Sequence, residues 1–297
     1  MIEVALNEQV DRSVNPNVPY SVDELVRDAV ACVNAGAQLL HWHARDGATG
    51  TQRWQDTELY AEAITRIRAE CDVILYPSQP GVGFDVFRHI FELADDPQVG
   101  LDLTTVDIMP IRLRPVLDKN GALAAPWNPG PSDPMVEVMT ELHRRGVPYS
   151  LGVRDIGDMR HLASYRDMGL LADEVTIKIF FDESAKGPVP DARGILMYLD
   201  SVPVGMTCRW FATFYSGLSD GRAFRRVSML AAAMGGHIRT GLGDNPRLDG
   251  NATRTNADYV DIAVAMAHAA GREVATVAEA RSMLGVTQRV PAMESGI

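Results

Sequence analysis

The segment Leu39–Asp46 reads Leu-Leu-His-Trp-His-Ala-Arg-Asp and contains the residues of this chain best suited to binding a metal ion. Side chains alternate between the two faces of a β-strand, so His41, His43 and Arg45 would share one face. Two imidazoles on the same face can reach a single ion. The spacing alone fits a metal site and an ordinary strand end about equally well, so the choice depends on the surrounding elements.

The composition is that of a soluble globular protein with a sizeable core. The chain has 297 residues, of which 46% are hydrophobic and 23% are charged. Its net charge of -11 argues against a nucleic acid or an anionic membrane as partner, because binding phosphate requires clustered Lys and Arg. Residues 1–8 lack the basic segment and apolar run of a signal peptide, and no apolar run approaches membrane-spanning length. We therefore expect a cytoplasmic protein.

Short β-rich runs alternate with amphipathic helical stretches along the whole chain, giving eight predicted strand–helix units. Eight such units predict an α/β fold, the single-domain (β/α)8 TIM barrel, whose usual size is about 250 residues. The predicted strands are Ile2–Leu6, Gln38–His43, Val73–Pro77, Leu101–Thr105, Pro148–Val153, Glu174–Ile179, Thr207–Phe214 and His237–Gly241. The predicted helices are Ser21–Ala35, Thr57–Glu70, Phe84–Leu93, Met135–Arg145, Ile156–Met168, Ala192–Leu199, Arg222–Met234 and Asn256–Ala270.

One domain is expected to span residues 1–297, ending in an extra helix, Thr276–Leu284, and a loose tail, Val290–Ile297. The stretch Asp118–Pro134 is rich in Pro, Gly and Asn and predicts a long loop after the fourth strand, either a lid on the catalytic side or a plain solvated loop. An open doubly wound sheet is the alternative fold. It lacks support, because no G-x-G-x-x-G follows the first strand.

Polar residues stand at several predicted strand ends, where a (β/α)8 barrel builds its active site. Glu8, Arg45 and Thr104 are expected to contact substrate, although a threonine there can simply close a strand. Lys178 lies on the sixth strand and could equally be a solvated surface lysine. The other residues of this kind are Asn7, Ser78, Thr105, Tyr215 and Ser216.

The segment Gly235–Asn245 is the strongest of these candidates. It combines a predicted strand with the charged residues Arg239 and Asp244 and with several glycines. Glycine allows a ligand or phosphate to approach the backbone closely. We therefore expect Arg239 and Asp244 to belong to the active site.

These motifs together resemble the family of β-keto acid cleavage enzymes, of which the chain looks like a divergent member. The resemblance runs from the first strand to the final helix and is strongest over residues 16–46 and 235–245. It is carried by Pro16-Asn17-Val18-Pro19 leading into Ser21–Glu24, by Ala35-Gly36-Ala37, by the H-x-H-x-R-D run, by Ser78, and by Gly-Gly-His-Ile-Arg-Thr-Gly at residues 235–241.

The resemblance implies a zinc-dependent (β/α)8 barrel, usually a homotetramer. Such an enzyme exchanges acyl groups between a β-keto acid and acetyl-CoA by condensation and retro-Claisen cleavage, giving acetoacetate and a new CoA thioester. By the same match, His41 and His43 would bind zinc and the metal would bind the keto acid. Asp244 with Arg239 would transfer protons and orient a carboxylate, and Ser78 would hold substrate.

The chain departs from the family pattern at two places. Where the family has a zinc-binding Glu before the catalytic Asp, this chain has Gly243. A catalytic zinc usually has three protein ligands and one open position, so Glu8, Asp244 or a water is expected to complete the site. Glu8 stands where relatives more often carry glycine. Gly152 lies near a family glutamate position, so the substrate and even the reaction are open to change.

Two other functions remain open. A metal-dependent hydrolase or lyase acting on a small carboxylate, with an amidohydrolase-like barrel, would place further histidines at the ends of strands five and six. His143 and His161 instead fall in predicted helices. A non-catalytic barrel that binds a small acid would show neither stoichiometric zinc nor CoA-dependent turnover.

Overall fold

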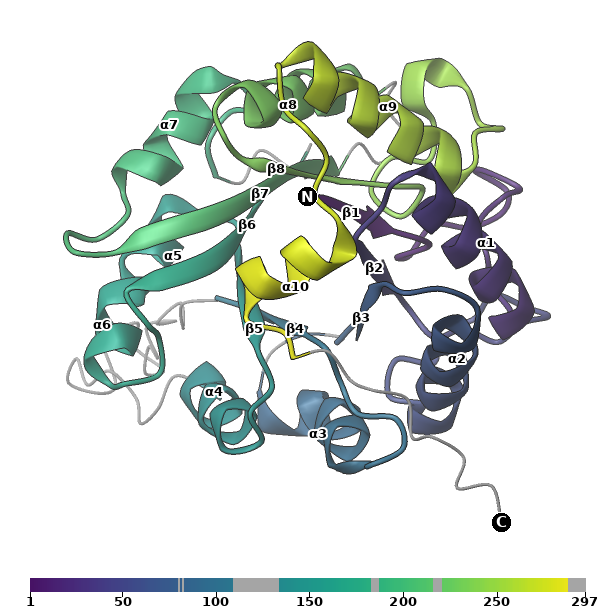
Figure 1. Ribbon diagram of the computed structural model, residues 1–297, viewed down its shortest axis with the longest axis horizontal. Helices are drawn as coiled ribbons and strands as arrows, with labels where there is room; N and C mark the ends of the chain where they lie inside the picture. Colours follow the sequence, from purple (N-terminus) through teal and green to yellow (C-terminus); the bar gives the residue numbers. More distant parts are fainter. Residues whose placement is uncertain (80, 82, 109–133, 183–186, 216–220, 288–297) are drawn as a thin grey trace, which may run out of the picture.

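Eight parallel strands form a nearly closed barrel surrounded by helices, which confirms the predicted TIM-barrel fold (Figure 1). The computed structural model describes residues 1–297 except 80, 82, 109–133, 183–186, 216–220 and 288–297. The strand order is β3-β2-β1-β8-β7-β6-β5-β4. The strands are β1 (Ile2–Ala5), β2 (Leu39–Trp42), β3 (Ile74–Pro77), β4 (Thr104–Asp107), β5 (Tyr149–Val153), β6 (Glu174–Asp182), β7 (Thr207–Tyr215) and β8 (His237–Thr240).

The helices follow the strands in alternation. They are α1 (Val22–Ala35), α2 (Thr57–Glu70), α3 (Arg88–Asp95), α4 (Pro134–Arg144), α5 (Ile156–Met159), α6 (His161–Asp167), α7 (Ala192–Asp200), α8 (Arg222–Ala233), α9 (Asn256–Ala269) and α10 (Val277–Leu284), with short 3-10 helices at Phe84–Phe87 and Leu248–Gly250. Among the described helices, none is long and apolar enough to cross a membrane. The predicted tail and nearly all of the predicted loop Asp118–Pro134 lie outside the described residues; Pro134 itself begins α4.

Helix α1 shows how local sequence sets an element boundary. Ser21 Oγ accepts a hydrogen bond from the backbone N–H of Glu24, and the Glu24 carboxylate accepts one from the backbone N–H of Ser21 at 2.9 Å. This capping box satisfies two N–H groups that the first turn leaves without helical partners. Gly36 ends the helix at φ 115°, a conformation that favours glycine.

Strand β4 begins at Thr104, later than the predicted start at Leu101, because the side chain of Asp102 bonds to β3 just before it. The buried Asp102 carboxylate accepts from the backbone N–H of Leu75 in β3 at 3.0 Å and pairs with Arg68 at 3.0 Å. A side chain therefore takes a place that a backbone carbonyl would fill in a regular ladder. At its other end β4 reaches Asp107, two residues beyond the predicted end, because it stays paired with β5 up to Gly152.

The predicted helix Ile156–Met168 is divided into α5 and α6 at Arg160. The backbone N–H of Arg160 donates to the Gly157 carbonyl at 3.2 Å. This i→i+3 bond tightens the chain into a 3-10-like turn and interrupts the helix.

Helix α10 covers the amino-terminal end of the barrel, where it lies across the centre of the ring (Figure 1). Ala280 and Leu284 of α10 pack in one apolar cluster with Phe211 in the middle of β7 and with residues near the starts of other strands: Met1, Leu39, Ile74 and Leu103. Because this end is filled with apolar side chains, the polar residues of the interior gather toward the carboxyl end.

Candidate metal centre and active-site cavity

The loop after β1 is fixed to the end of β2 by hydrogen bonds. Asn7 Oδ1 accepts from the backbone N–H of His43 at 2.8 Å, and Asn7 Nδ2 donates to the His43 carbonyl at 3.0 Å. The Arg45 guanidinium donates to the backbone carbonyls of Asn7, Glu8 and Val10. Arg45 therefore holds the segment that carries Glu8. It is not among the residues that line the cavity described below.

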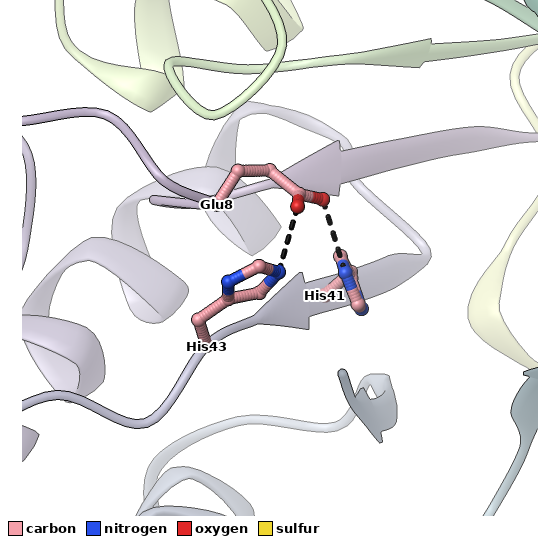
Figure 2. Close-up of side chains that lie close together, drawn as sticks. All are labelled: Glu8, His41 and His43. Carbon is pink, nitrogen blue, oxygen red and sulfur yellow. Dashed lines mark ion pairs between the residues drawn. The ribbon is translucent and has the colours of Figure 1, made fainter. Parts of the chain in front are cut away.

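Glu8, His41 and His43 form a compact group of possible metal ligands. Figure 2 shows both imidazoles pointing at the two carboxylate oxygens, with His41 Nε2 3.0 Å from Oε1 and His43 Nε2 2.7 Å from Oε2. One ligand atom from each residue lies within 4.8 Å of the other two. Glu8 has a positive φ of 38°, which costs about 1–3 kcal/mol for a residue other than glycine. Such strain at a side chain aimed into the site is typical of a functional position.

Contacts on the opposite ring nitrogens orient the two imidazoles. His41 Nδ1 lies 3.3 Å from the Tyr76 carbonyl oxygen and His43 Nδ1 lies 3.2 Å from Gln52 Oε1. Metal-binding histidines usually donate their second N–H to an oxygen in this way. Burial lowers the pKa of His41, although the Glu8 carboxylate opposes the shift. The neutral imidazole that binds a metal is therefore the favoured form.

Gly243 leaves the space that the Glu8 side chain occupies. A Cβ atom at position 243 would overlap Glu8 Cγ and lie 2.9 Å from Glu8 Cβ and 3.0 Å from the Ala5 carbonyl oxygen. The two positions therefore compete for one volume. The Glu8 side chain in this position therefore requires a residue without a side chain at position 243.

A buried network of charges lies beneath the metal group. Arg239 donates to Asp244 through Nε and one NH2 group at 3.0 Å each, to Glu3 Oε1 at 3.0 Å, and to Glu8. Each of its three nitrogens thus has an acceptor. Asp244 Oδ2 also accepts from Thr213 Oγ1 at 2.8 Å, and burial raises the pKa of Asp244 despite the opposing effect of Arg239.

Lys178 belongs to the same network and is only 1% exposed, so it is not a solvated surface lysine. Its Nζ lies 2.8 Å from Glu3 Oε2 and contacts the Tyr76 hydroxyl. Burial lowers the pKa of Lys178 to about 8, although Glu3 opposes that shift. Burial alone would raise the pKa of Glu3, but Lys178 and Arg239 bring it down to about 2.

A cavity of about 260 Å³ opens above these residues at the carboxyl ends of the strands. The ligand group and Arg239 line one side of it. Its other lining residues are Gln9, Trp54, Tyr76, Ser78, Gln79, Gly81, Thr105, Asp107, Arg154, Phe180 and Tyr215. A small ligand bound in the cavity would touch both the ligand group and the aromatic and charged side chains facing it.

The structure places the remaining predicted residues at different depths. Ser78 lines the cavity, whereas Asp244 lies behind Arg239 and is not a lining residue. Thr104 is fully buried and does not line the cavity either. Its neighbour Thr105 does, because successive residues of β4 point to opposite faces.

Sequence reasoning did not select Trp54, Asp107, Arg154 or Phe180. Asp107 was missed because β4 ends later than predicted, and Phe180 because β6 continues to Asp182. Trp54 lies in the loop after β2, with its ring 4.5 Å from that of His43. A shift of the predicted strand ends by two residues would have found Asp107 and Phe180.

The sequence and structure are similar to those of known proteins over almost the whole chain. A sequence model of the family described as beta-keto acid cleavage enzyme matches residues 1–286. The 3-keto-5-aminohexanoate cleavage enzyme of Fusobacterium nucleatum is 29% identical over 287 residues, which is 94% of each chain. The 3-oxoadipate:acetyl-CoA acetyltransferase of Cupriavidus necator is 26% identical over 99% of this chain and 96% of its own.

A solved structure titled as the apo form of ObcA superposes with a TM-score of 0.66 at 15% identity. The match covers 91% of this chain and 66% of that one, so the chain spans about two thirds of its length. At this identity the likeness supports the fold alone.

Proposed function

Because this chain belongs to the β-keto acid cleavage enzyme family, we propose that it exchanges acyl groups between a β-keto acid and acetyl-CoA, releasing acetoacetate and a new CoA thioester. One observation carries the proposal. The group Glu8, His41 and His43 borders a cavity at the carboxyl ends of a barrel whose sequence matches the family from residue 1 to 286. The relatives are named for keto acids that differ at the end remote from the carboxylate, with an amino group in one and a second carboxylate in another.

We propose zinc as the metal, held by Glu8, His41 and His43. Two imidazoles and one carboxylate are a known ligand set of catalytic zinc, and their ligand atoms are close enough to share one ion. The cavity would supply the open position. Bound zinc would act as a Lewis acid on the keto oxygen of the substrate.

The residues around this group have distinct proposed tasks. Ser78, at the cavity wall, would hold the keto acid by its hydroxyl. Condensation requires removal of a proton from the carbon between the keto and carboxylate groups. We assign this step to Asp244 acting together with Arg239, because Asp244 lies behind Arg239 and reaches the cavity through its contact with that side chain. Arg239, which bonds to both Asp244 and Glu8, would fix these two carboxylates relative to each other.

The test is formation of acetoacetate from acetyl-CoA with a panel of β-keto acids, with the thioester products identified by mass spectrometry. We expect acetoacetate from at least one keto acid, stoichiometric zinc in the purified protein, and loss of zinc in Glu8→Gln but not in His143→Gln, which changes a histidine on α4. Asp244→Asn should keep the zinc and lower kcat about 10²- to 10⁴-fold. Cleavage of the keto acid without CoA, or metal-loaded protein that forms no acetoacetate, would contradict the proposal and favour the hydrolase alternative.

We also propose that the protein is a homotetramer, as the family resemblance implies. Light scattering after size-exclusion chromatography would measure the mass of the assembly against the 32.4 kDa of one chain. A mass equal to one chain at micromolar concentration would exclude this state.

A further inference from the structure

Arg154 and Asp107 lie together on the cavity wall that faces the metal ligands. An NH2 group of Arg154 donates to Asp107 Oδ2 at 3.2 Å, and both residues line the cavity. Arg154 follows β5 and Asp107 ends β4, whereas the histidines come from β2 on the other side of the ring (Figure 1). A keto acid bound at the metal group would therefore extend its far end toward Arg154 and Asp107.

Arg154 and Asp107 differ in how many hydrogen bonds they can still form with a ligand. One Asp107 oxygen accepts from Arg154, and the other lies directly over Gly152, where an added Cβ would overlap it. The Arg154 side chain is 37% exposed and uses one NH2 group in this pair. A guanidinium has five N–H donors, so Arg154 retains donors for a ligand while the Asp107 carboxylate is largely committed.

Aromatic rings hold the Arg154 guanidinium in place. Its Cζ lies 4.5 Å from the centre of the Phe180 ring and 5.6 Å from that of Tyr215. The two rings are stacked with centres 5.5 Å apart. A guanidinium fixed against aromatic faces loses little freedom when it binds a planar anion.

Among the described residues, Arg239 is the other arginine that lines the cavity, and each of its nitrogens already has an acceptor. It donates to the carboxylates of Glu3, Glu8 and Asp244 and is 3% exposed. A substrate carboxylate would have to displace one of these buried partners to reach Arg239. Arg154 is therefore the better-placed carboxylate receptor.

Building on the acyl exchange proposed above, we propose that Arg154 binds a second carboxylate at the far end of the keto acid, and that the enzyme prefers dicarboxylic β-keto acids. The planar fork of arginine matches a carboxylate with two parallel hydrogen bonds. The aromatic rings hold the fork in position and Asp107 neutralises part of its charge, so replacing the Asp107 carboxylate with an amide should strengthen the interaction.

Binding of unreactive acids tests this directly, without any turnover. Calorimetry would compare glutarate with valerate, which has a carbon chain of the same length and one carboxylate fewer. We expect wild-type protein to bind glutarate about 10- to 100-fold more tightly, the range for a charged hydrogen-bonded pair. Arg154→Gln should abolish the preference, Asp107→Asn should increase it, and Arg144→Gln, at an exposed arginine of α4, should leave it unchanged. Equal affinity of wild-type protein for the two acids would overturn the proposal.

Kinetics with three keto acids separate this inference from the proposed function. We expect Arg154→Gln to lower kcat/KM for 3-oxoadipate about 10- to 100-fold and to leave that for 3-oxohexanoate nearly unchanged. A preference of the wild type for 5-amino-3-oxohexanoate, or an equal loss with both other acids, would overturn the role of Arg154 while preserving acyl exchange. Arg154-dependent glutarate binding without turnover would refute acyl exchange and preserve the carboxylate site. Circular dichroism of each variant would verify its fold.

Discussion

Glu8 joins the candidate metal ligands of this protein into one group. Its carboxylate contacts both imidazoles, and its side chain lies in the space above Gly243. The histidine pair could be found from sequence because both residues lie in one short strand, where spacing alone places them on one face. The contact between Glu8 and Gly243 joins opposite ends of the chain, so only the structure could show it.

Exchanging the residues at positions 8 and 243 should move the carboxylate ligand to the other position and preserve metal binding. We expect Glu8→Gly to lower zinc affinity at least 10- to 100-fold. The glycine should fold well, because position 8 has a positive φ. The double variant Glu8→Gly with Gly243→Glu should recover zinc, as measured by equilibrium competition with a chelator and by elemental analysis.

The single variant Gly243→Ala tests whether the side chains at positions 8 and 243 compete for the same space. Gly243→Ala should destabilise the wild type by about 1–3 kcal/mol, because its Cβ would overlap Glu8 Cγ. The same change in a Glu8→Gly background should cost much less. An equal loss of stability in both backgrounds, followed by urea unfolding, would disprove the competition for space.

At the scale of elements, Asp28 and Asn256 connect α1 to α9 and to the barrel. Asn256 Nδ2 donates to Asp28 Oδ2 at 2.6 Å and to the Leu6 carbonyl at 2.9 Å, while Asn256 Oδ1 accepts from the Leu242 N–H at 2.7 Å. Burial raises the pKa of Asp28 to about 7, although the hydrogen bond from Asn256 opposes the shift. This carboxyl therefore holds a proton more tightly in the folded state than in the unfolded one.

Stability should consequently fall as the pH rises. The favourable contribution of the Asp28 proton is complete below the ordinary aspartate pKa of 3.8 and is lost as the pH passes through about 7. We expect the melting temperature to fall between pH 5 and pH 8 by several degrees more in the wild type than in Asp28→Asn. Asp261→Asn, at an exposed position of α9, should behave as the wild type. Identical pH profiles for wild type and Asp28→Asn would contradict this role.

The order of the elements followed from the sequence, and so did both ends of α2, whereas the ends of β4 and β6 did not. Alternating β-rich and amphipathic runs predicted eight strand–helix units correctly because each pattern is local. The predicted start of β4 was wrong because the Asp102 side chain replaces a ladder bond with β3, and the predicted end was wrong because β4 stays paired with β5 up to Asp107. Both are contacts between distant segments. Asp107 was therefore not predicted as a site residue, and neither was Arg154, which bonds to it. Lys178 was undecided for a similar reason, since its partner Glu3 lies on the first strand.

At the scale of the whole molecule, the barrel separates stability from chemistry. Helix α10 fills the amino end with apolar contacts, whereas the candidate metal ligands and the cavity lie at the carboxyl end. This division is common to (β/α)8 enzymes, whose catalytic loops follow the carboxyl ends of the strands.

Substitutions that loosen the packing at the amino-terminal end of the barrel should therefore leave the site intact. Leu284→Ala should lower the free energy of unfolding by about 2–4 kcal/mol, because Leu284 belongs to the buried cluster under α10. Met283→Ala, on the exposed side of the same helix, should cost far less. Zinc content and glutarate affinity should match those of the wild type in both variants; a loss of either in Leu284→Ala would show that the two ends are coupled.

The shared volume of Glu8 and Gly243 also constrains how such a site can evolve. A lineage that moves its ligand carboxylate from one position to the other cannot hold both side chains at once. Either order of substitution passes through an intermediate that lacks a ligand or is overcrowded. The two residues are therefore expected to change together among homologues, so that sequences with Glu at 8 carry Gly at 243 and those with Glu at 243 carry a small residue at 8.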